Sequence, residues 1–169
     1  MVSIPWWGIV LFIMLMVVLV VSLIASATAT RLNRMHVRTD LARASLEAAL
    51  GRRAAIVRVA FPELGPDLAQ AEAIPITASE PYARADAENT LSRRISELQG
   101  GRELDKAVAI ELYDVHTRVE LARRFYNDAV TDTQALRRLP LVKMLRLAGT
   151  APQPEYFDMS DSVVPRGEE

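Results

Sequence analysis

The sequence predicts an all-α protein, in which an N-terminal transmembrane helix continues into an antiparallel bundle of three to four helices. Three observations predict this class. Residues 1–30 carry no charged side chain. The segments 31–60 and 112–136 then place mostly apolar residues at alternating intervals of three and four, which is the spacing of helices that pack on other helices. The chain is also rich in Ala, Leu, Arg and Glu, which lose little rotamer freedom in a helix.

The segment 1–30 is expected to be a transmembrane anchor, because about 20 apolar residues cross a hydrocarbon core of about 30 Å as a helix. Ala25-Ser26-Ala27 resembles a signal-peptide cleavage site. A signal peptide, however, begins with basic residues and has a shorter apolar run, so an uncleaved anchor is favoured. Residues 31–60 carry seven arginines and residues 1–30 none. By the positive-inside rule the N-terminus lies outside, Trp6 and Trp7 lie at the outer headgroup boundary, and the rest faces the cytoplasm.

A cytoplasmic bundle is predicted for 31–150, and its first helix, 31–60, is expected to continue the anchor without a break. Gly51 weakens this helix but permits a neighbouring helix to approach closely. Arg53 falls on the packing seam, where it either reaches solvent or pairs with Glu120 or Asp128. The two histidines, His36 and His116, have no metal-ligand spacing and are expected to be solvated or to cap helices.

Proline and glycine divide the middle of the chain. Pro62 ends the first helix, 66–73 forms a short helix, and Pro81 begins a helix over 81–98. Its predicted apolar stripe consists of Ala83, Ala87, Leu91, Ile95 and Leu98. Charges occupy the other predicted faces of this helix, at Arg84, Asp86, Glu88, Arg93, Arg94 and Glu97. A turn at Gly100-Gly101 then joins it to the long helix 102–138 as an antiparallel hairpin.

The long helix has a predicted inward face at Leu112, Val115, Val119, Ala122, Tyr126, Ala129, Thr133 and Leu136. Tyr126 on this face needs a partner for its hydroxyl, and Asn127 is costly within a helix unless its amide is hydrogen-bonded. We expect the polar residues Arg124, Asn127 and Asp128 either to clamp the first helix through Arg52 or Arg53, or to face outward toward a partner.

The end of the long helix is followed by a short basic amphipathic segment around Pro140. Its cations are Arg137, Arg138, Lys143 and Arg146, interspersed with leucines. Such a segment suits an anionic inner leaflet, although its leucines could instead cap the bundle. The remaining residues, 151–169, are expected to be extended or disordered, with Tyr156-Phe157 as a docking point.

Charge and composition narrow the classes of function. Twenty basic residues are matched by twenty-one acidic ones along the same helices, so nucleic-acid binding is not expected. The absence of cysteine excludes disulfides and thiolate metal sites. No cofactor motif occurs, and we expect neither a cofactor nor a metal site.

Ala122-Arg-Arg-Phe-Tyr-Asn-Asp-Ala-Val130 resembles the signature of the LemA family. The segment 46–53 is similar to the first long helix of that family, and 88–94 to its third. The segments 54–59 and 61–80 depart from the family pattern, so the chain resembles a shortened, divergent member of the actinobacterial type. The resemblance implies a bacterial plasma-membrane protein whose long helix returns to the bilayer. Its candidate signature and interaction residues are Arg52, Arg53, Glu120, Arg123, Arg124, Tyr126, Asn127 and Asp128.

We expect a non-catalytic bundle that binds or organises membrane-associated protein partners at the inner membrane face, including possible homo-oligomers. An alternative is an accessory subunit of a larger membrane complex, because small residues within 25–29 permit close helix contact. A membrane-tethered hydrolase using Glu120 and Asp128 is a further alternative. It would require these carboxylates to gather with Tyr126 and Asn127 in one cavity.

Overall fold

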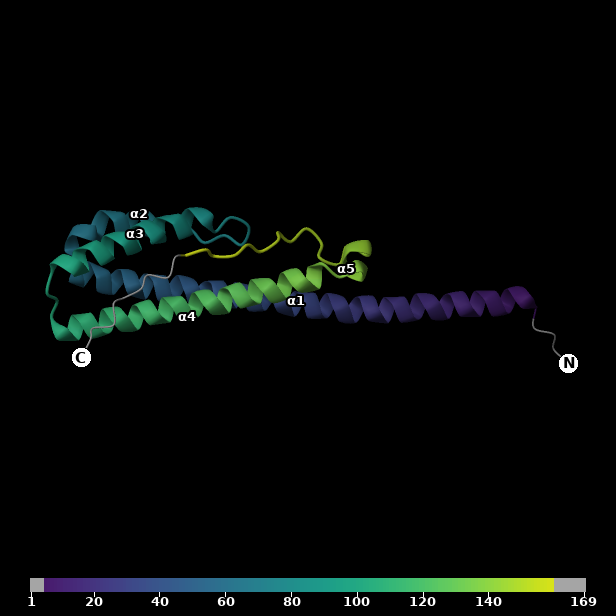
Figure 1. The fold of residues 1–169 in the computed structure, drawn as a ribbon. Helices are drawn as coiled ribbons and strands as arrows, with labels where there is room; N and C mark the ends of the chain where they lie inside the picture. Colours follow the sequence, from purple (N-terminus) through teal and green to yellow (C-terminus); the bar gives the residue numbers. More distant parts are fainter. Residues whose placement is uncertain (1–4, 160–169) are drawn as a thin grey trace.

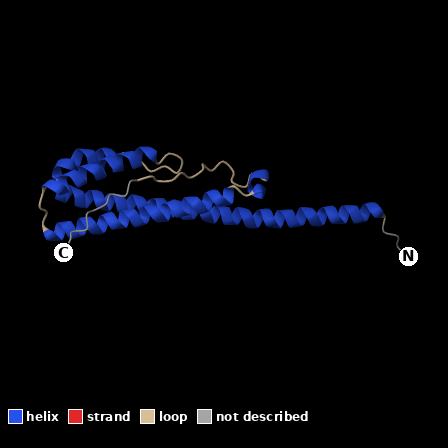
Figure 2. Ribbon diagram, in the orientation of Figure 1, coloured by secondary structure: helices blue, strands red, loops and turns tan. Residues whose placement is uncertain are grey.

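The computed structural model describes residues 5–159 as an assembly of helices, and no strand occurs among them (Figure 2). This confirms the predicted all-α class. A single 3₁₀ turn, Pro62–Leu64, follows the first helix. The helices are α1 (Trp6–Ala60), α2 (Gly65–Glu72), α3 (Tyr82–Gly101), α4 (Lys106–Arg137) and α5 (Pro140–Met144).

Helix α1 is uninterrupted from Trp6 to Ala60, and its N-terminal part extends alone beyond the bundle (Figure 1). The large apolar side chains between Ile9 and Ile24 are all exposed. Among the described residues, α1 is the one helix that is long and apolar enough to cross a membrane. The predicted continuation of the apolar anchor into the bundle as one helix is therefore confirmed.

Helices α1 and α4 run antiparallel and share the most extensive packing in the molecule (Figure 1). All eight predicted inward positions of α4 are buried. On α1 the buried set includes Leu32, Leu46 and Ala60, but Met35 and Ala49 are only partly buried. Leu50, Ala54 and Val57 are buried in addition. The α1 seam is wider because this helix also faces α2 and α3.

Helix α3 presents a different face to the core than its alanines predicted. Ala83 is exposed, whereas Arg84, Ala85 and Glu88 are buried. Leu91 and Ile95 of the expected stripe are buried as predicted, and the buried face extends from them by about one residue toward the charged side of the helix. The reason lies on α1, where the buried Arg53 requires a carboxylate opposite it.

The connection between α3 and α4 lies later than the glycine pair predicted. Helix α3 continues through Gly101, and residues 102–105 form the turn. Helix α4 begins where the Asp105 side chain accepts a hydrogen bond from the Ala107 backbone N–H at 2.8 Å. This side-chain cap defines the start of the long helix.

The C-terminal end of α4 lies where α1 leaves the bundle. Leu32 of α1, Leu136 of α4 and Val142 of α5 form one buried cluster there. Residues 151–159 then run back along the bundle without regular secondary structure (Figure 1). Their predicted extension is observed, and of the predicted docking pair Phe157 is buried against the bundle whereas Tyr156 is exposed. The rest of the predicted tail, 160–169, lies outside the described residues.

Candidate functional site

A layer of buried charge divides the core of the bundle. The Arg53 side chain from α1 is about 1% exposed and forms an ion pair with Glu88 of α3, which is 3% exposed. Arg53 also donates to the Ser92 hydroxyl at 3.1 Å. Arg84 completes the layer, with its Nε donating to Glu88 Oε1 at 2.8 Å. The prediction that Arg53 pairs with Glu120 or Asp128 is therefore wrong. The alternative that Arg53 reaches solvent is wrong as well.

The buried layer carries two guanidinium groups and one carboxylate. Arg84 gains a further acceptor in the Ile74 backbone carbonyl at 2.9 Å. Burial lowers the pKa of Arg53, and Glu88 opposes the shift. The guanidinium stays protonated because its intrinsic pKa lies far above neutral pH. Arg53 thus contributes a permanent positive charge to the layer.

His116 of α4 lies beside this layer. Its two ring nitrogens are buried and have no hydrogen-bond partner among the described residues. Burial, assisted by the positive charge of Arg53, lowers the pKa of His116 to about 4. The ring is therefore neutral at neutral pH. The expectation of a solvated or capping histidine is wrong here, because α4 points this side chain toward the core.

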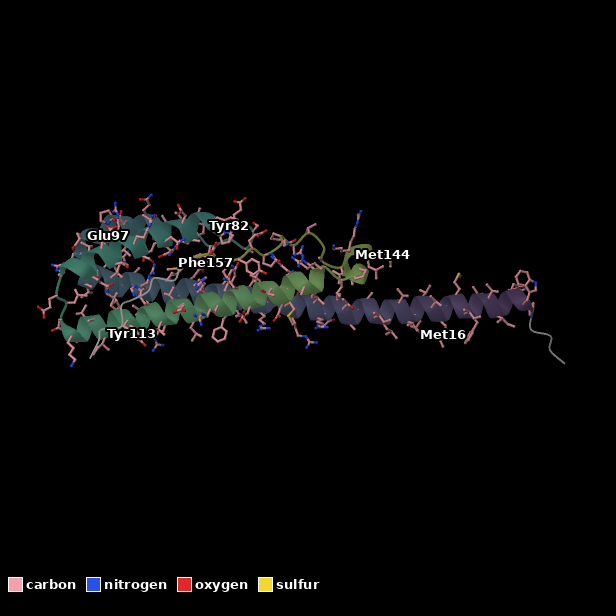
Figure 3. All side chains as sticks on the ribbon, in the orientation of Figure 1. Met16, Tyr82, Glu97, Tyr113, Met144 and Phe157 are labelled. Carbon is pink, nitrogen blue, oxygen red and sulfur yellow. The ribbon has the colours of Figure 1, made fainter. Side chains whose placement is uncertain are left out.

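Tyr126 and Asn127 of α4 bind the C-terminal segment rather than α1. The Tyr126 hydroxyl donates to the Glu155 backbone carbonyl at 2.9 Å. Asn127 makes two bonds to the Phe157 backbone, accepting its N–H at 2.9 Å and donating to its carbonyl at 3.2 Å. Figure 3 shows Phe157 on the inner side of the bundle. These two signature residues thus clamp the segment 151–159.

The clamp extends toward the C-terminal end of α4. The buried Gln134 donates to the Pro154 carbonyl at 2.8 Å. Arg137 donates to the carbonyls of Ala151 and Pro152 at 2.8 and 2.9 Å. One edge of α4 therefore binds the tail backbone through side chains, and Glu155 adds a backbone bond to Ala78 at 2.8 Å.

The other signature candidates lie outside the core and the clamp. Arg52 pairs with Glu111 at 2.8 Å across the surface between α1 and α4, and Glu120 pairs with Arg124 one turn further along α4. Asp128 is exposed and Arg123 is half-buried. The predicted clamp from Arg124 or Asp128 to Arg52 or Arg53 is wrong, because Arg53 is satisfied by α3.

The residues of the hydrolase alternative do not gather in one cavity. Glu120 faces Arg124 on the surface, Asp128 is exposed, and Tyr126 and Asn127 are bonded to tail backbone. Within the described chain, the arrangement that this alternative requires is not formed.

Basic residues gather at the end of the bundle from which the apolar part of α1 extends. A cavity of about 430 Å³ is lined by Arg137, Arg138, Lys143 and Arg146, together with Gln134, Val142, Ala148, Gly149 and Gln153. The structure thus brings all four predicted membrane-surface cations together. Trp6 and Trp7 lie at the opposite end of the exposed apolar stretch, in the first turn of α1, and both are exposed.

Sequence reasoning missed Arg84, Glu88, Ser92, Gln134 and the buried state of His116. A usable signal existed for α3, because residues 84, 88 and 92 are spaced by one helical turn and therefore share a face. Small residues at 83 and 87 suggested a competing stripe. Nothing local indicates which of the two faces is buried.

Comparisons of the chain with protein-family models, with curated proteins and with solved structures found no match.

Proposed function

We propose that this chain is a non-catalytic, single-pass protein of the bacterial plasma membrane whose cytoplasmic bundle binds and organises protein partners at the inner face. The resemblance to the LemA family supports the same proposal. The observation that carries it is a helix face on α1 that stays exposed among the described residues, which we call the outer stripe.

The outer stripe consists of residues spaced by three or four that are all exposed and uncharged: Val37, Leu41, Ala44, Ala48, Gly51, Ala55 and Val59. At 3.6 residues per turn, these positions lie on the side of α1 opposite Leu46 and Arg53. A solvent-facing helix surface is normally polar. A Cβ at Gly51 would meet no atom within 4 Å, so packing within the chain does not require glycine there. The stripe therefore has the features of a helix-packing seam without its partner.

The occupant we propose is the same stripe of a second copy. Anchoring in one membrane makes the two α1 helices parallel, and a repeating three-and-four spacing is the pattern of a parallel coiled coil. The flanks are complementary in charge, with Asp40 and Glu47 on one side of the stripe and Arg38 and Arg52 on the other. In a parallel pair Glu47 faces Arg52 of the other copy, five residues further along, and the contact occurs twice by symmetry.

The charges needed for this contact are accessible. Glu47 lies 3.5 Å from Arg43, and Arg52 pairs with Glu111, with every one of these side chains between about a third and three-fifths exposed. Exposed ion pairs are worth about 0–1 kcal/mol, so exchange for a partner across the interface costs little.

Cysteine crosslinking tests the proposal, because the chain contains no cysteine of its own. Ala48→Cys or Gly51→Cys is placed in the full-length protein in native membranes and oxidised. We expect a disulfide-linked homodimer from both. Thr117→Cys is the matched control, since this exposed residue lies on the outward side of α4. Monomer at all three positions, or equal dimer at Thr117, would contradict the proposal.

A second candidate is the accessory-subunit function, with a helix of a different subunit on the outward side of α4. That side exposes Ile110, Tyr113, Leu121 and Phe125. A photo-crosslinking residue at Phe125 would then yield one product of fixed stoichiometry containing a different chain. Products of random size would count against this alternative.

A further inference from the structure

We propose that the basic cavity between the end of α4, α5 and the following turn binds the phosphate group of an anionic phospholipid headgroup. This goes beyond protein-partner binding, because it assigns a defined lipid site in the bundle rather than a general attraction to the bilayer.

The lining of this cavity is one-sided in charge. Arg137, Arg138, Lys143 and Arg146 contribute to its wall, and no carboxylate does. Among the described residues, Arg138, Lys143 and Arg146 form no ion pair, and all three are exposed. Several arginines elsewhere in the bundle are paired with acids, as in Arg38 with Asp132 at 2.7 Å. Three unneutralised cations around one hollow favour an anionic ligand.

The fourth cation is positioned by the fold. Arg137 is half-buried and is held by the carbonyls of Ala151 and Pro152, so it forms part of a preorganised wall. Burial of His36 lowers its pKa, and the positive charge of Arg137 lowers it further. The Arg137 Nη1 atom lies 3.4 Å from His36 Nε2. Because His36 is neutral, the net positive charge at this end of the bundle comes from the arginines and the lysine.

The turn after α5 brings the remaining cations to the cavity. Arg146 adopts a left-handed backbone conformation with φ of 49°, and Gly149 follows with φ of 56°. A left-handed arginine is uncommon and carries a backbone cost. The turn is closed by the Leu147 N–H bond to the Val142 carbonyl at 3.0 Å. This tight turn places Arg146 on the wall of the same cavity, which Lys143 lines from α5.

The position of the cavity identifies a membrane lipid as the source of the phosphate. Val142 lines the cavity and also belongs to the buried cluster with Leu32, two residues after the charge-free segment of α1 ends. With residues 1–30 as the membrane anchor of the proposed function, on which this step rests, the cavity lies at the level where α1 emerges from the bilayer. Met144 is 74% exposed at this end of the bundle, where Figure 3 labels it, and Leu139 is also exposed. Such apolar side chains next to cations match the headgroup and acyl boundary of a membrane.

The volume is consistent with this ligand. A cavity of about 430 Å³ falls within the range of about 300–1,000 Å³ that small-molecule sites occupy. A phosphate with its glycerol substituent fits such a space, and arginine and lysine are the side chains that proteins use to bind phosphate.

Lipid binding to the full-length protein in a neutral detergent tests the site, because a micelle lacks the anionic surface that would attract any cation. Phosphatidylglycerol is titrated and bound lipid is counted by native mass spectrometry, with phosphatidylcholine as the neutral comparison. We expect saturable binding of phosphatidylglycerol. The variant Lys143→Gln/Arg146→Gln should bind it about tenfold or more weakly, a change of about 1.4 kcal/mol or more, since two charged contacts to the phosphate are lost.

The matched control is Arg31→Gln/Arg34→Gln, which removes two exposed arginines from α1 at the same end of the bundle, neither of them ion-paired among the described residues. This variant should bind phosphatidylglycerol within about twofold of the parent, because a factor of two corresponds to only about 0.4 kcal/mol. Equal weakening in the two variants would overturn the proposal, since it would show attraction to surface charge in general. Equal binding of phosphatidylcholine would overturn it as well.

A separate arm distinguishes the source of the phosphate. Inorganic phosphate at millimolar concentration is added to the complex with phosphatidylglycerol. Retention of the lipid supports a membrane headgroup as the ligand, because the acyl chains add binding that free phosphate lacks. Complete displacement at that concentration would show that the cavity selects soluble phosphate, and the lipid assignment would be wrong. Circular dichroism of both double variants verifies that the helices remain folded.

Discussion

Arg53 of α1 and Glu88 of α3 form an ion pair inside the bundle, where each side chain is less than 5% exposed. The pair separates two apolar clusters, one around Leu46, Tyr126 and Phe157 and the other around Val57 and Leu112. Because the guanidinium and carboxylate must meet, the pair determines how α3 is rotated against α1. The ion pair therefore sets the rotation of α3 as well as linking α3 to α1.

Removing one member of this pair should destabilise the bundle strongly. We expect Glu88→Ala to lower the free energy of unfolding by about 3–5 kcal/mol, because it leaves Arg53 and Arg84 buried without a carboxylate. Urea unfolding of the detergent-solubilised protein, followed by circular dichroism, measures the change. Arg52→Ala is the neighbouring control, since its pair with Glu111 is exposed and should contribute about 0–1 kcal/mol. A comparable loss for both would contradict the importance of burial.

Acid should destabilise the folded bundle through His116. Its folded pKa of about 4 lies below the ordinary value of 6.5, so the unfolded chain binds more protons between these two values. The stability that depends on neutral His116 is present above pH 6.5 and is lost as the pH falls toward 4. At about 1.4 kcal/mol per pKa unit, the total effect is on the order of 3 kcal/mol. Thermal unfolding between pH 7 and 4 measures it.

The control for the pH effect is His116→Phe, which has no proton to bind. Its melting temperature should fall less than that of the parent over the same pH range. Identical pH profiles for the two proteins would assign the acid sensitivity to other groups.

Asn127→Ala should release the C-terminal segment while leaving the helices formed. The substitution removes both hydrogen bonds to the Phe157 backbone, with a cost of roughly 1–3 kcal/mol. Faster hydrogen exchange and proteolysis at 151–159 are the expected result. Asp128→Ala, at an exposed neighbour, should change neither. Loss of helicity throughout the bundle would show instead that Asn127 supports the helix packing itself.

The orientation of the anchor is tested by reporter fusions. A reporter that is active only outside the cell, fused after Glu169, should be inactive, because the positive-inside rule predicts that the arginines after residue 30 keep the bundle in the cytoplasm. The same reporter fused before Met1 should be active. Activity at the C-terminal fusion would reverse the assignment. Quenching of Trp6 and Trp7 fluorescence by lipids brominated near the headgroup would locate both indoles at the interface.

Much of the fold could be predicted from periodicity alone. The helix class, the continuation of the anchor into the first helix and the inward face of α4 follow from the three-and-four spacing, because a helix presents those positions to one side whatever its partner is. The four basic residues at 137–146 could also be identified in advance, since they are close in sequence. Their gathering around one cavity could not, because it depends on the left-handed turn at Arg146.

The sequence by itself determined the helical class, the apolar N-terminal segment and the inward face of α4, because these depend on local spacing and composition. Only the tertiary structure decided that Arg53 meets Glu88, that α3 turns its charged residues inward, and that Tyr126 and Asn127 bind the tail. Each of those contacts joins residues at least 29 positions apart. The choice between burying a paired charge and exposing it depends on whether a partner lies opposite in space, which no local pattern contains.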